Sequence, residues 1–308
     1  VRNSAVRRAT TDGMKHYIKA TALCLHLVLI VGLCACEEQD GSASGAVSSE
    51  VMDGWINNAW TGFGAFCAGD EELAMVSEIA GANAATYGEI MPEQFREVAN
   101  WMGLGKDDVF MDMGSGVGKT VAQAWLEYGV QLSVGVELVP SRHAIAVSSM
   151  LEVAELFKTE YPNLGSMDCF DEEGVHECCF IPKHDASADW SMQLTGRKVE
   201  EEVPQCARLL QGDMLKQDLE NVTTVWISSL CMGPEQLDSA VAKLEVEAPK
   251  LRRVASIKRL PGGLLGFEEE VPLHLPMSWT ADVDDTQFPK DVAVHLYSRS
   301  PEPADPTT

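Results

Sequence analysis

The chain has 308 residues, 45% of them hydrophobic, and it carries 23 Lys and Arg against 47 Asp and Glu, a formal net charge of −24. This length suffices for one large α/β domain with extensions. The acidic balance excludes general, charge-driven binding of nucleic acid and favours basic partners, so we expect no strong DNA binding.

Residues 1–50 are predicted to be a leader followed by a linker. Lysines precede an apolar run over residues 20–36 that ends in "LCAC". A positive start, a short apolar stretch and small residues at its end are typical of a secretory signal or a signal anchor. We therefore expect membrane association through residues 20–36, with a buried helix as the alternative. The Gly-, Ser- and acid-rich residues 37–50 predict a disordered linker.

Three further divisions follow along the chain. Residues 51–104 are predicted to be largely helical and to lie ahead of the sheet. Residues 105–300 alternate apolar strand-like and helix-like segments, and residues 301–308 form a tail. Within the main domain, residues 162–205 are polar and aperiodic, and they predict a surface insertion.

The stretch "DDVFMDMGSGVGKT" raises the question of which cofactor its glycine-rich turn holds. Gly118, Lys119 and Thr120 match the end of a phosphate-binding loop, but Met113 occupies the position of that motif's first glycine. The alternative is a strand over residues 109–113, a glycine turn and a helix, as in dinucleotide or S-adenosylmethionine sites.

Carboxylates follow three predicted strands. "LSVGVEL" ends near Glu137, about twenty residues past the turn, where a ribose-binding acid belongs. Asp112 directly precedes the turn; it suits the cationic methionine part of S-adenosylmethionine better than a pyrophosphate. "ARLLQGDML" ends in Asp213, which can bind an adenine amino group, and Met214 can pack on the ring. Each acid alone could instead cap the next helix.

The remaining pattern predicts an α/β Rossmann-like fold with a mostly parallel sheet of the seven-stranded type and an N-terminal helical extension. Further strands are predicted at residues 221–230, 251–260 and 291–299, the last antiparallel, and helices at residues 140–161 and 233–248. The fifth strand, "LRRVASIKRL", is also the best local candidate for a basic contact surface, although sheet edges often carry such charges.

Nine cysteines occur without an obvious framework. Cys169, Cys178 and Cys179 lie near His176 and His184 in residue types that can bind zinc, but their spacing matches no paired knuckle. A disulfide within this segment, or free thiols, is the expectation, and no metal is predicted. Three scattered cysteines are predicted to be small core residues: Cys67, Cys206 and Cys231.

Six segments occur in the order and approximate spacing of one family: "TYGEIMPEQF", "VFMDMGSGVGKTVAQ", "VGVEL", "LLQGDML", "SSLCMGPE" and "MSWT". Over residues 84–300, without the insertion, the chain resembles the non-SET histone H3 lysine methyltransferases, the disruptor-of-telomeric-silencing family. The resemblance implies a methyltransferase fold, S-adenosylmethionine as cofactor, protein-lysine methylation, a basic protein substrate such as histone H3, and the nucleus as location.

The resemblance also implies site residues. A loop containing Tyr87, Gly88 and Glu89 would close over the methyl donor. The donor-binding set would be Tyr87, Glu89, Asp112, Gly114, Gly116, Gly118, Glu137, Asp213 and Met214. On the acceptor side the resemblance carries over Trp279 as an aromatic wall, with an ordinary core aromatic as the alternative. The reaction itself makes Ser228 and Ser229 candidates for orienting the donor or the amine, with strand-end serines bonded to the backbone as the alternative. Tyr87 completes the catalytic set, and Trp279, Leu230 and Met232 would line an apolar lysine channel.

Departures from the family leave alternatives open. An Asn-Asn-Phe-x-Phe-Gly-Pro motif reads Ser-Ser-Leu-Cys-Met-Gly-Pro over residues 228–234, and a family tyrosine position reads Ala293. One alternative is a methyltransferase for a small molecule or for another protein side chain. Another is a membrane-tethered relative without catalytic activity, because the leader conflicts with a nuclear location.

Overall fold

The computed structural model describes residues 47–61, 68–81, 87–172, 174–182, 204–280 and 290–300. The predicted leader and membrane association through residues 20–36, Cys67, His184 and the tail lie outside these residues. Among the helices that are described, none is both long and apolar enough to cross a bilayer.

Three helices precede the sheet: α2 (Ser49–Ala59), α3 (Asp70–Ala80) and α4 (Pro92–Met102). The Ser48 hydroxyl accepts a hydrogen bond from the Val51 amide at 3.4 Å, and Val47 is buried. A side-chain cap of this kind is the usual start of a helix. The end of the predicted linker is therefore ordered, which corrects the expectation of disorder up to residue 50.

The central sheet confirms the Rossmann-like prediction. Five strands run parallel in the order β5-β2-β1-β6-β7: β5 (Gln205–Gln211), β2 (Leu132–Glu137), β1 (Val109–Met113), β6 (Thr224–Ile227) and β7 (Arg253–Ser256). The predicted late strand, β10 (Asp291–Arg299), pairs antiparallel with β7. Two short strands, β8 (Phe267–Glu269) and β9 (Leu273–Pro276), pair with β10.

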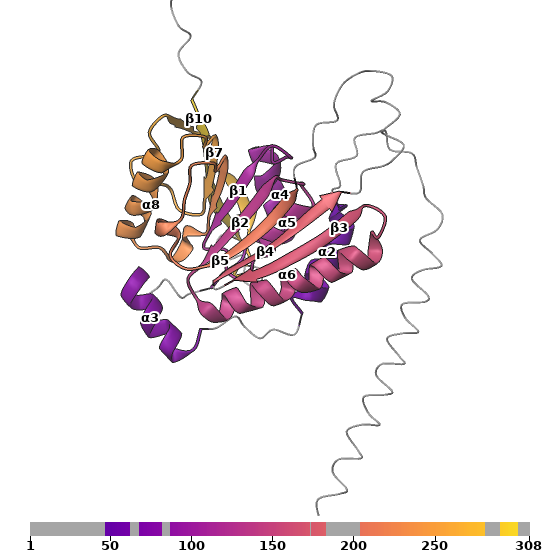
Figure 1. The fold of residues 1–308 in the computed structure, drawn as a ribbon. Helices are drawn as coiled ribbons and strands as arrows, with labels where there is room; N and C mark the ends of the chain where they lie inside the picture. The colour runs from indigo at the N-terminus through magenta and orange to yellow at the C-terminus, as the bar shows by residue number, and fades with distance from the viewer. Residues whose placement is uncertain are drawn as a thin grey trace, which may run out of the picture. The chain divides into compact units, whose positions relative to one another are not determined.

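Helices cover both faces of the parallel core (Figure 1). Consecutive residues of β1 point to opposite faces: Phe110 packs in a cluster with α4, and Met111 packs with α8 (Pro234–Glu247). Helices α5 (Lys119–Leu126) and α6 (Pro140–Glu160) lie on the Phe110 face together with α2. Burial on both faces explains why these strands read as apolar runs.

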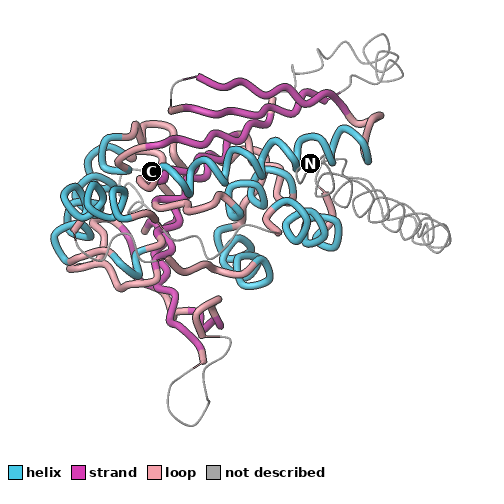
Figure 2. The backbone as a smooth tube through the Cα atoms, turned by 90° about the horizontal axis from the view of Figure 1, so that it is seen from below, coloured by secondary structure: helices cyan, strands magenta, loops and turns pink. Residues whose placement is uncertain are grey.

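The beginning of the predicted surface insertion is instead part of the sheet. Strands β3 (Gly165–Glu172) and β4 (Val175–Pro182) form a hairpin, and β4 pairs antiparallel with β5. Seen from below, this hairpin borders the sheet with α6 beside it (Figure 2). The polar composition misled the prediction because β3 is an edge strand with exposed polar side chains: Ser166, Asp168, Asp171 and Glu172.

Two disulfides connect these three strands. Cys169 and Cys178 are opposite each other on β3 and β4, and Cys179 and Cys206 are opposite each other on β4 and β5. Consecutive strand residues point to opposite faces, so the two bonds lie on different faces of the sheet. A disulfide within the segment was expected, but the assignment of Cys206 as an ordinary core residue was wrong.

The cations of the basic segment around β7 have partners within the fold, although the Arg259 side chain is still 71% exposed. Arg252 pairs with Asp108 at 2.7 Å, Arg253 stacks on Trp101 at 4.9 Å, the Lys258 ammonium donates to the Met232 carbonyl at 2.8 Å, and Arg259 pairs with Glu269 at 2.7 Å. These contacts connect β7 and the residues after it to neighbouring parts of the fold.

Candidate functional site

The glycine turn joins β1 to α5 at the carboxyl edge of the parallel strands. Gly114, Gly116 and Gly118 have φ angles of 90°, 54° and 81°, a region that favours glycine. A Cβ atom at Gly116 would lie 2.7 Å from the Tyr87 ring, so the absence of a side chain also lets the preceding loop approach the turn.

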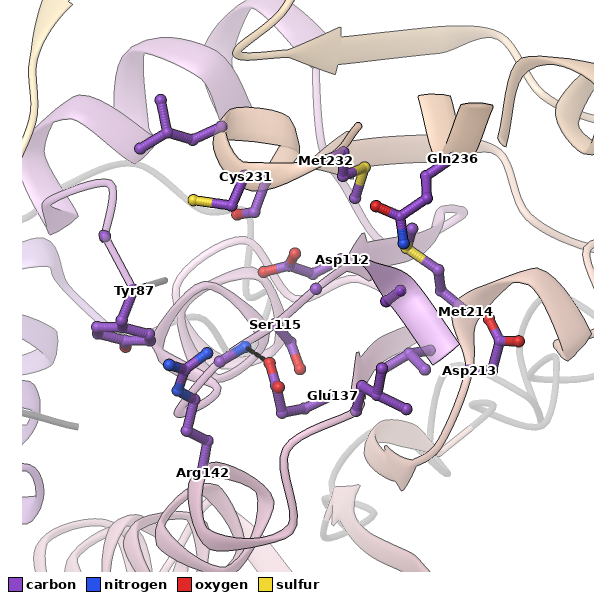
Figure 3. Close-up of a pocket in the computed structure, with 18 of the residues that line it drawn as sticks. Tyr87, Asp112, Ser115, Glu137, Arg142, Asp213, Met214, Cys231, Met232 and Gln236 are labelled. Atoms are coloured by element: carbon purple, nitrogen blue, oxygen red, sulfur yellow. Dashed lines mark hydrogen bonds between the residues drawn. The ribbon is translucent and has the colours of Figure 1, made fainter. Parts of the chain in front are cut away.

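A cleft of about 340 Å³ opens above this turn and gathers most of the predicted donor residues (Figure 3). Its lining includes Tyr87, Glu89, Asp112, Gly114, Gly116, Glu137, Asp213 and Met214. Gly118 is outside the lining; a Cβ atom there would lie 3.1 Å from that of Ala146 on α6. Gly118 therefore serves the close packing of α5 against α6.

Asp112 lies in the cleft wall at the end of β1 and is 2% exposed. Its Oδ2 accepts a hydrogen bond from the Thr120 hydroxyl, while its Oδ1 is buried without a hydrogen-bond partner. Burial raises the pKa of Asp112 to about 7, and the nearby Glu137 charge adds to this rise although the Thr120 bond opposes it. A buried acceptor with a free oxygen fits a cationic ligand group.

Glu137 ends β2 and supports the turn from the side. Its Oε2 accepts a hydrogen bond from the Gly116 amide at 2.8 Å, and its Oε1 accepts one from the Val139 amide at 2.8 Å. Burial raises the pKa of this carboxyl, and the backbone amides oppose the rise. Each carboxylate oxygen has a second lone pair, so Glu137 can accept hydroxyl hydrogen bonds from a ligand as well.

Asp213 and Met214 lie on the side of the cleft opposite Tyr87 (Figure 3). The Asp213 carboxylate accepts a hydrogen bond from the Leu215 amide at 2.9 Å and so caps the short helix η1 (Met214–Lys216). Asp213 therefore caps a helix and lines the cleft at the same time. Capping fixes the direction of the carboxylate at the rim.

The covering loop is folded onto the turn. The Tyr87 hydroxyl donates a hydrogen bond to Glu89, and the Arg142 guanidinium stacks on the Tyr87 ring with its Cζ 4.7 Å from the centroid. Burial raises the pKa of Tyr87, and the Glu89 charge adds to the rise. Arg142, from the first turn of α6, lines the cleft but was not found from the sequence, because no motif marks it.

The two candidate serines have different surroundings. Ser228 lines the cleft, and its hydroxyl accepts a hydrogen bond from the Trp226 indole at 3.1 Å. Ser229 is fully buried and outside the cleft lining: its Oγ lies 2.8 Å from the Ser256 Oγ and accepts a hydrogen bond from the Lys258 amide at 2.7 Å. The structure brings Ser228 but not Ser229 to the cleft lining, and for Ser229 this placement favours the alternative of a serine bonded within the fold.

Trp279 also lies outside the cleft lining and supports the covering loop. Its ring packs against Gly88, where a Cβ atom would come within 2.5 Å of the indole. The predicted channel side is formed by Ser228, Leu230, Cys231, Met232 and Ile257. Ala293 lies on β10 opposite His274. Among the described residues, Trp279 packs in the same hydrophobic cluster as Leu230 and Ile257, and its contact with Gly88 links it to the covering loop.

Two groups of metal-ligand type occur in the described residues, and both contain a disulfide. They are Cys169 with His176 and Cys178, and Glu177 with Cys179 and Cys206. A sulfur in a disulfide is no thiolate ligand, so neither group can bind a metal as it stands. Cys231, a free thiol in the described chain, lines the cleft instead.

Comparison with known proteins identifies the family likeness of this region. Residues 74–165 match the family described as "Histone methylation protein DOT1". The H3 lysine-79 specific histone-lysine N-methyltransferase of Candida glabrata is 31% identical over 132 residues, 42% of this chain and 17% of that protein. The same-named protein of Kluyveromyces lactis is 43% identical over 67 residues, 22% of this chain and 12% of that protein.

The resemblance found in the motifs is thus confirmed for the covering loop, the glycine turn and β2. The chain spans less than a fifth of the length of these two relatives. Among solved structures, an RNA methyltransferase of Salinibacter ruber in complex with S-adenosyl-L-homocysteine is 16% identical with a TM-score of 0.34, over 70% of this chain and 97% of that one. That likeness is too low to support an argument about function.

Proposed function

We propose that this chain is an S-adenosylmethionine-dependent methyltransferase that transfers a methyl group to lysine side chains of a basic protein, of which histone H3 is the first candidate. One observation carries the proposal: Asp112, Glu137 and Asp213 converge on one cleft above a glycine turn. The match of residues 74–165 to the DOT1 family supports the same conclusion.

The chemistry of the cleft fits the donor group by group. The unpartnered Oδ1 of Asp112 is suited to the donor's ammonium, and the second lone pairs of Glu137 are suited to its ribose hydroxyls. Asp213 and Met214 at the far rim suit the adenine. When bound, the donor supplies an electrophilic methyl group on a sulfonium.

A nucleoside triphosphate fits the same cleft poorly. Met113 replaces the glycine that begins a phosphate loop, and the Lys119 ammonium is 2.8 Å from Glu89. The carboxylates of Asp112 and Glu137 would also face the phosphates. Like charges at such short range cost free energy in a partly buried site, so we exclude this alternative.

The chain contributes to the reaction mainly by positioning. Holding donor and acceptor in line supplies about 7–11 kcal/mol of a bimolecular barrier. Leu230, Met232 and Ile257 give the channel side an apolar surface. An apolar surface lowers the pKa of an approaching lysine, so it favours the uncharged amine that can attack. The acidic rim, including Glu235, attracts the positively charged substrate protein.

A second candidate is methylation of a small molecule or of another protein side chain. It rests on the channel side, where Ser228, Leu230, Cys231 and Met232 stand and the Trp279 indole lies outside the lining. Among the described residues that form the channel side none is aromatic, so the side chain that enters the channel is selected less strictly for the length and shape of lysine.

Two observations bear on location. The names of the relatives favour the nucleus, where a histone substrate resides. The two disulfides favour an oxidising compartment, because structural disulfides are rare in nuclear and cytosolic proteins. We propose the nuclear location from the names of the relatives alone; the disulfides count against it, and detection of the chain in nuclear and other cell fractions tests it.

The deciding experiment is donor-dependent methylation of core histones and of a lysine-rich peptide, with the product site located by mass spectrometry. Transfer to lysine that is lost in Asp112→Ala supports the proposal. Turnover on small acceptors alone would favour the second candidate. A folded protein that binds no S-adenosylmethionine in calorimetry would overturn both.

A further inference from the structure

Lys119, the residue that makes the turn resemble a phosphate loop, has a different partner in the fold. Its Nζ lies 2.8 Å from the Glu89 Oε2, and their side chains are 21% and 15% exposed. The pair bridges the first residue of α5 and the covering loop, which are thirty residues apart in the chain. Partial burial keeps such a pair less screened by salt than a surface pair.

Glu89 is also the point where the loop is attached to the opposite side of the site. Its amide donates a hydrogen bond to the Ser278 hydroxyl at 2.9 Å, and its carbonyl accepts one from the Ser278 amide at 3.1 Å. The neighbouring Trp279 packs on Gly88. One residue therefore connects the glycine turn, through its side chain, with the Trp279 turn, through its backbone.

Contacts within the site also hold the Tyr87 end of the covering loop. The Tyr87 hydroxyl donates to Glu89, the ring lies close to Gly116, and the Arg142 guanidinium lies over the ring. Figure 3 shows Tyr87 and Arg142 on the same side of the cleft. Orientation of Tyr87 thus depends on where the Glu89 carboxylate is fixed. Tyr87, Glu89 and Lys119 all line the cleft, so a shift of this carboxylate changes the wall that faces a bound donor.

We infer that Glu89 and Lys119 form an ionic clasp that holds the covering loop closed over the donor, which makes both of them positioning residues; this inference rests on the proposed function. A loop that is already ordered costs less conformational entropy when ligand binds. When the clasp is broken, the loop becomes ordered only when ligand binds, and the entropy cost of ordering it then reduces the affinity. The donor is then bound more weakly, while the rate at saturating donor changes less.

The experiment compares Lys119→Gln, Glu89→Gln and the charge-exchanged double variant Lys119→Glu/Glu89→Lys in the full chain. S-adenosylhomocysteine is the probe, measured by calorimetry, and donor KM and kcat are measured separately. We expect each single variant to weaken probe binding and raise the donor KM by about fivefold to twentyfold, with kcat within about twofold. The double variant should recover most of the loss.

A readout independent of any donor is hydrogen exchange of residues 87–90 in the free protein, which should become faster in both single variants. Lys158→Gln is the matched control, because Lys158 and Glu155 form an exposed pair on α6. It should change neither measurement. Thermal unfolding reports whether each variant is folded.

Unchanged probe affinity and unchanged exchange in both single variants would overturn the clasp. Failure of the unaltered protein to bind the probe would instead overturn the proposed function. In that case hydrogen exchange alone tests the clasp. Exchange of residues 87–90 that is equally slow in the single variants and in the unaltered protein would contradict it.

Discussion

Gly88 lies against the Trp279 indole: a Cβ atom at Gly88 would be 2.5 Å from Cε3 and 2.7 Å from Cζ3 of that ring. The φ of Gly88 lies outside the left-handed region, so this contact, and not backbone strain, is what requires glycine. The covering loop and the turn before β10 therefore fit each other only without a side chain at this position.

Replacing Gly88 with alanine should force the loop and Trp279 apart. Overpacking of this kind costs about 1–3 kcal/mol, and we expect that cost in the free energy of unfolding together with weaker binding of S-adenosylhomocysteine. Gly54→Ala on the exposed side of α2 is the control, because nothing lies within 4 Å of its Cβ position. That change should stabilise the protein by about 0.5–1 kcal/mol. Equal unfolding energies for the two variants would contradict the contact.

Donor binding should depend on pH through Asp112, whose pKa is raised from 3.8 to about 7. A cationic ammonium favours the ionised carboxylate, so binding releases a proton below pH 7. Affinity should rise with pH, by up to about tenfold per unit, and level off above about pH 7. Calorimetry in buffers of different ionisation enthalpy measures the proton release. Asp112→Asn should bind weakly with no such slope, and a slope retained in that variant would assign it to another group.

The same shift predicts a pH dependence of stability. Because the folded pKa lies above the unfolded one, the folded chain binds more protons between about pH 4 and pH 7. The Asp112 contribution to stability is therefore largest at low pH and falls as pH rises through this window. Denaturant unfolding of the unaltered protein and of Asp112→Asn, compared at pH 5 and about pH 7.5, isolates the difference. A difference that grows in the opposite direction would contradict the assigned cause.

Ser228 and Ser229 should separate activity from stability. Ser229→Ala removes a buried hydroxyl that joins Ser256 and the Lys258 amide, so it should cost about 1–3 kcal/mol in unfolding. Ser228→Ala should cost less and should lower turnover, because Ser228 faces the cleft. Thr159→Ala, whose exposed hydroxyl donates to the Glu155 carbonyl within α6 and lies outside the cleft lining, is the control with an expected change below about 0.5 kcal/mol. A larger stability loss in Ser228→Ala would reverse the assignment.

The two disulfides should stabilise the protein to different extents. They close segments with sequence separations of 9 and 27 residues. Disulfides contribute about 2–4 kcal/mol each, and the longer segment should add about 1 kcal/mol more. We therefore expect Cys179→Ser/Cys206→Ser to lose more stability than Cys169→Ser/Cys178→Ser. Peptide mapping without reductant tests the pairing first, and free thiols at all four positions in freshly purified protein would refute it.

Parts of the site can be predicted from the sequence because they depend on the spacing of residues within one short segment. An apolar strand, a glycine turn and a helix follow each other within one short segment, and Glu137 comes at a fixed distance behind them. Parallel strands present their carboxyl ends at one edge, so acids that follow neighbouring strands must meet. The same argument located Asp112, Glu137 and Asp213 at a single cleft.

Other parts depend on which strands and loops become neighbours, and no local pattern encodes that. Adjacent residues on one segment can point to opposite environments, which is why Ser228 reaches the cleft and Ser229 does not. Pairing of Cys179 with Cys206 follows from the register between β4 and β5, across residues that lie far apart in the chain. The contact of Lys119 with Glu89 and the stacking of Arg142 on Tyr87 arise in the same way. The sequence by itself determined the glycine turn, because its geometry is local; only packing between distant segments decided which residues lie over it.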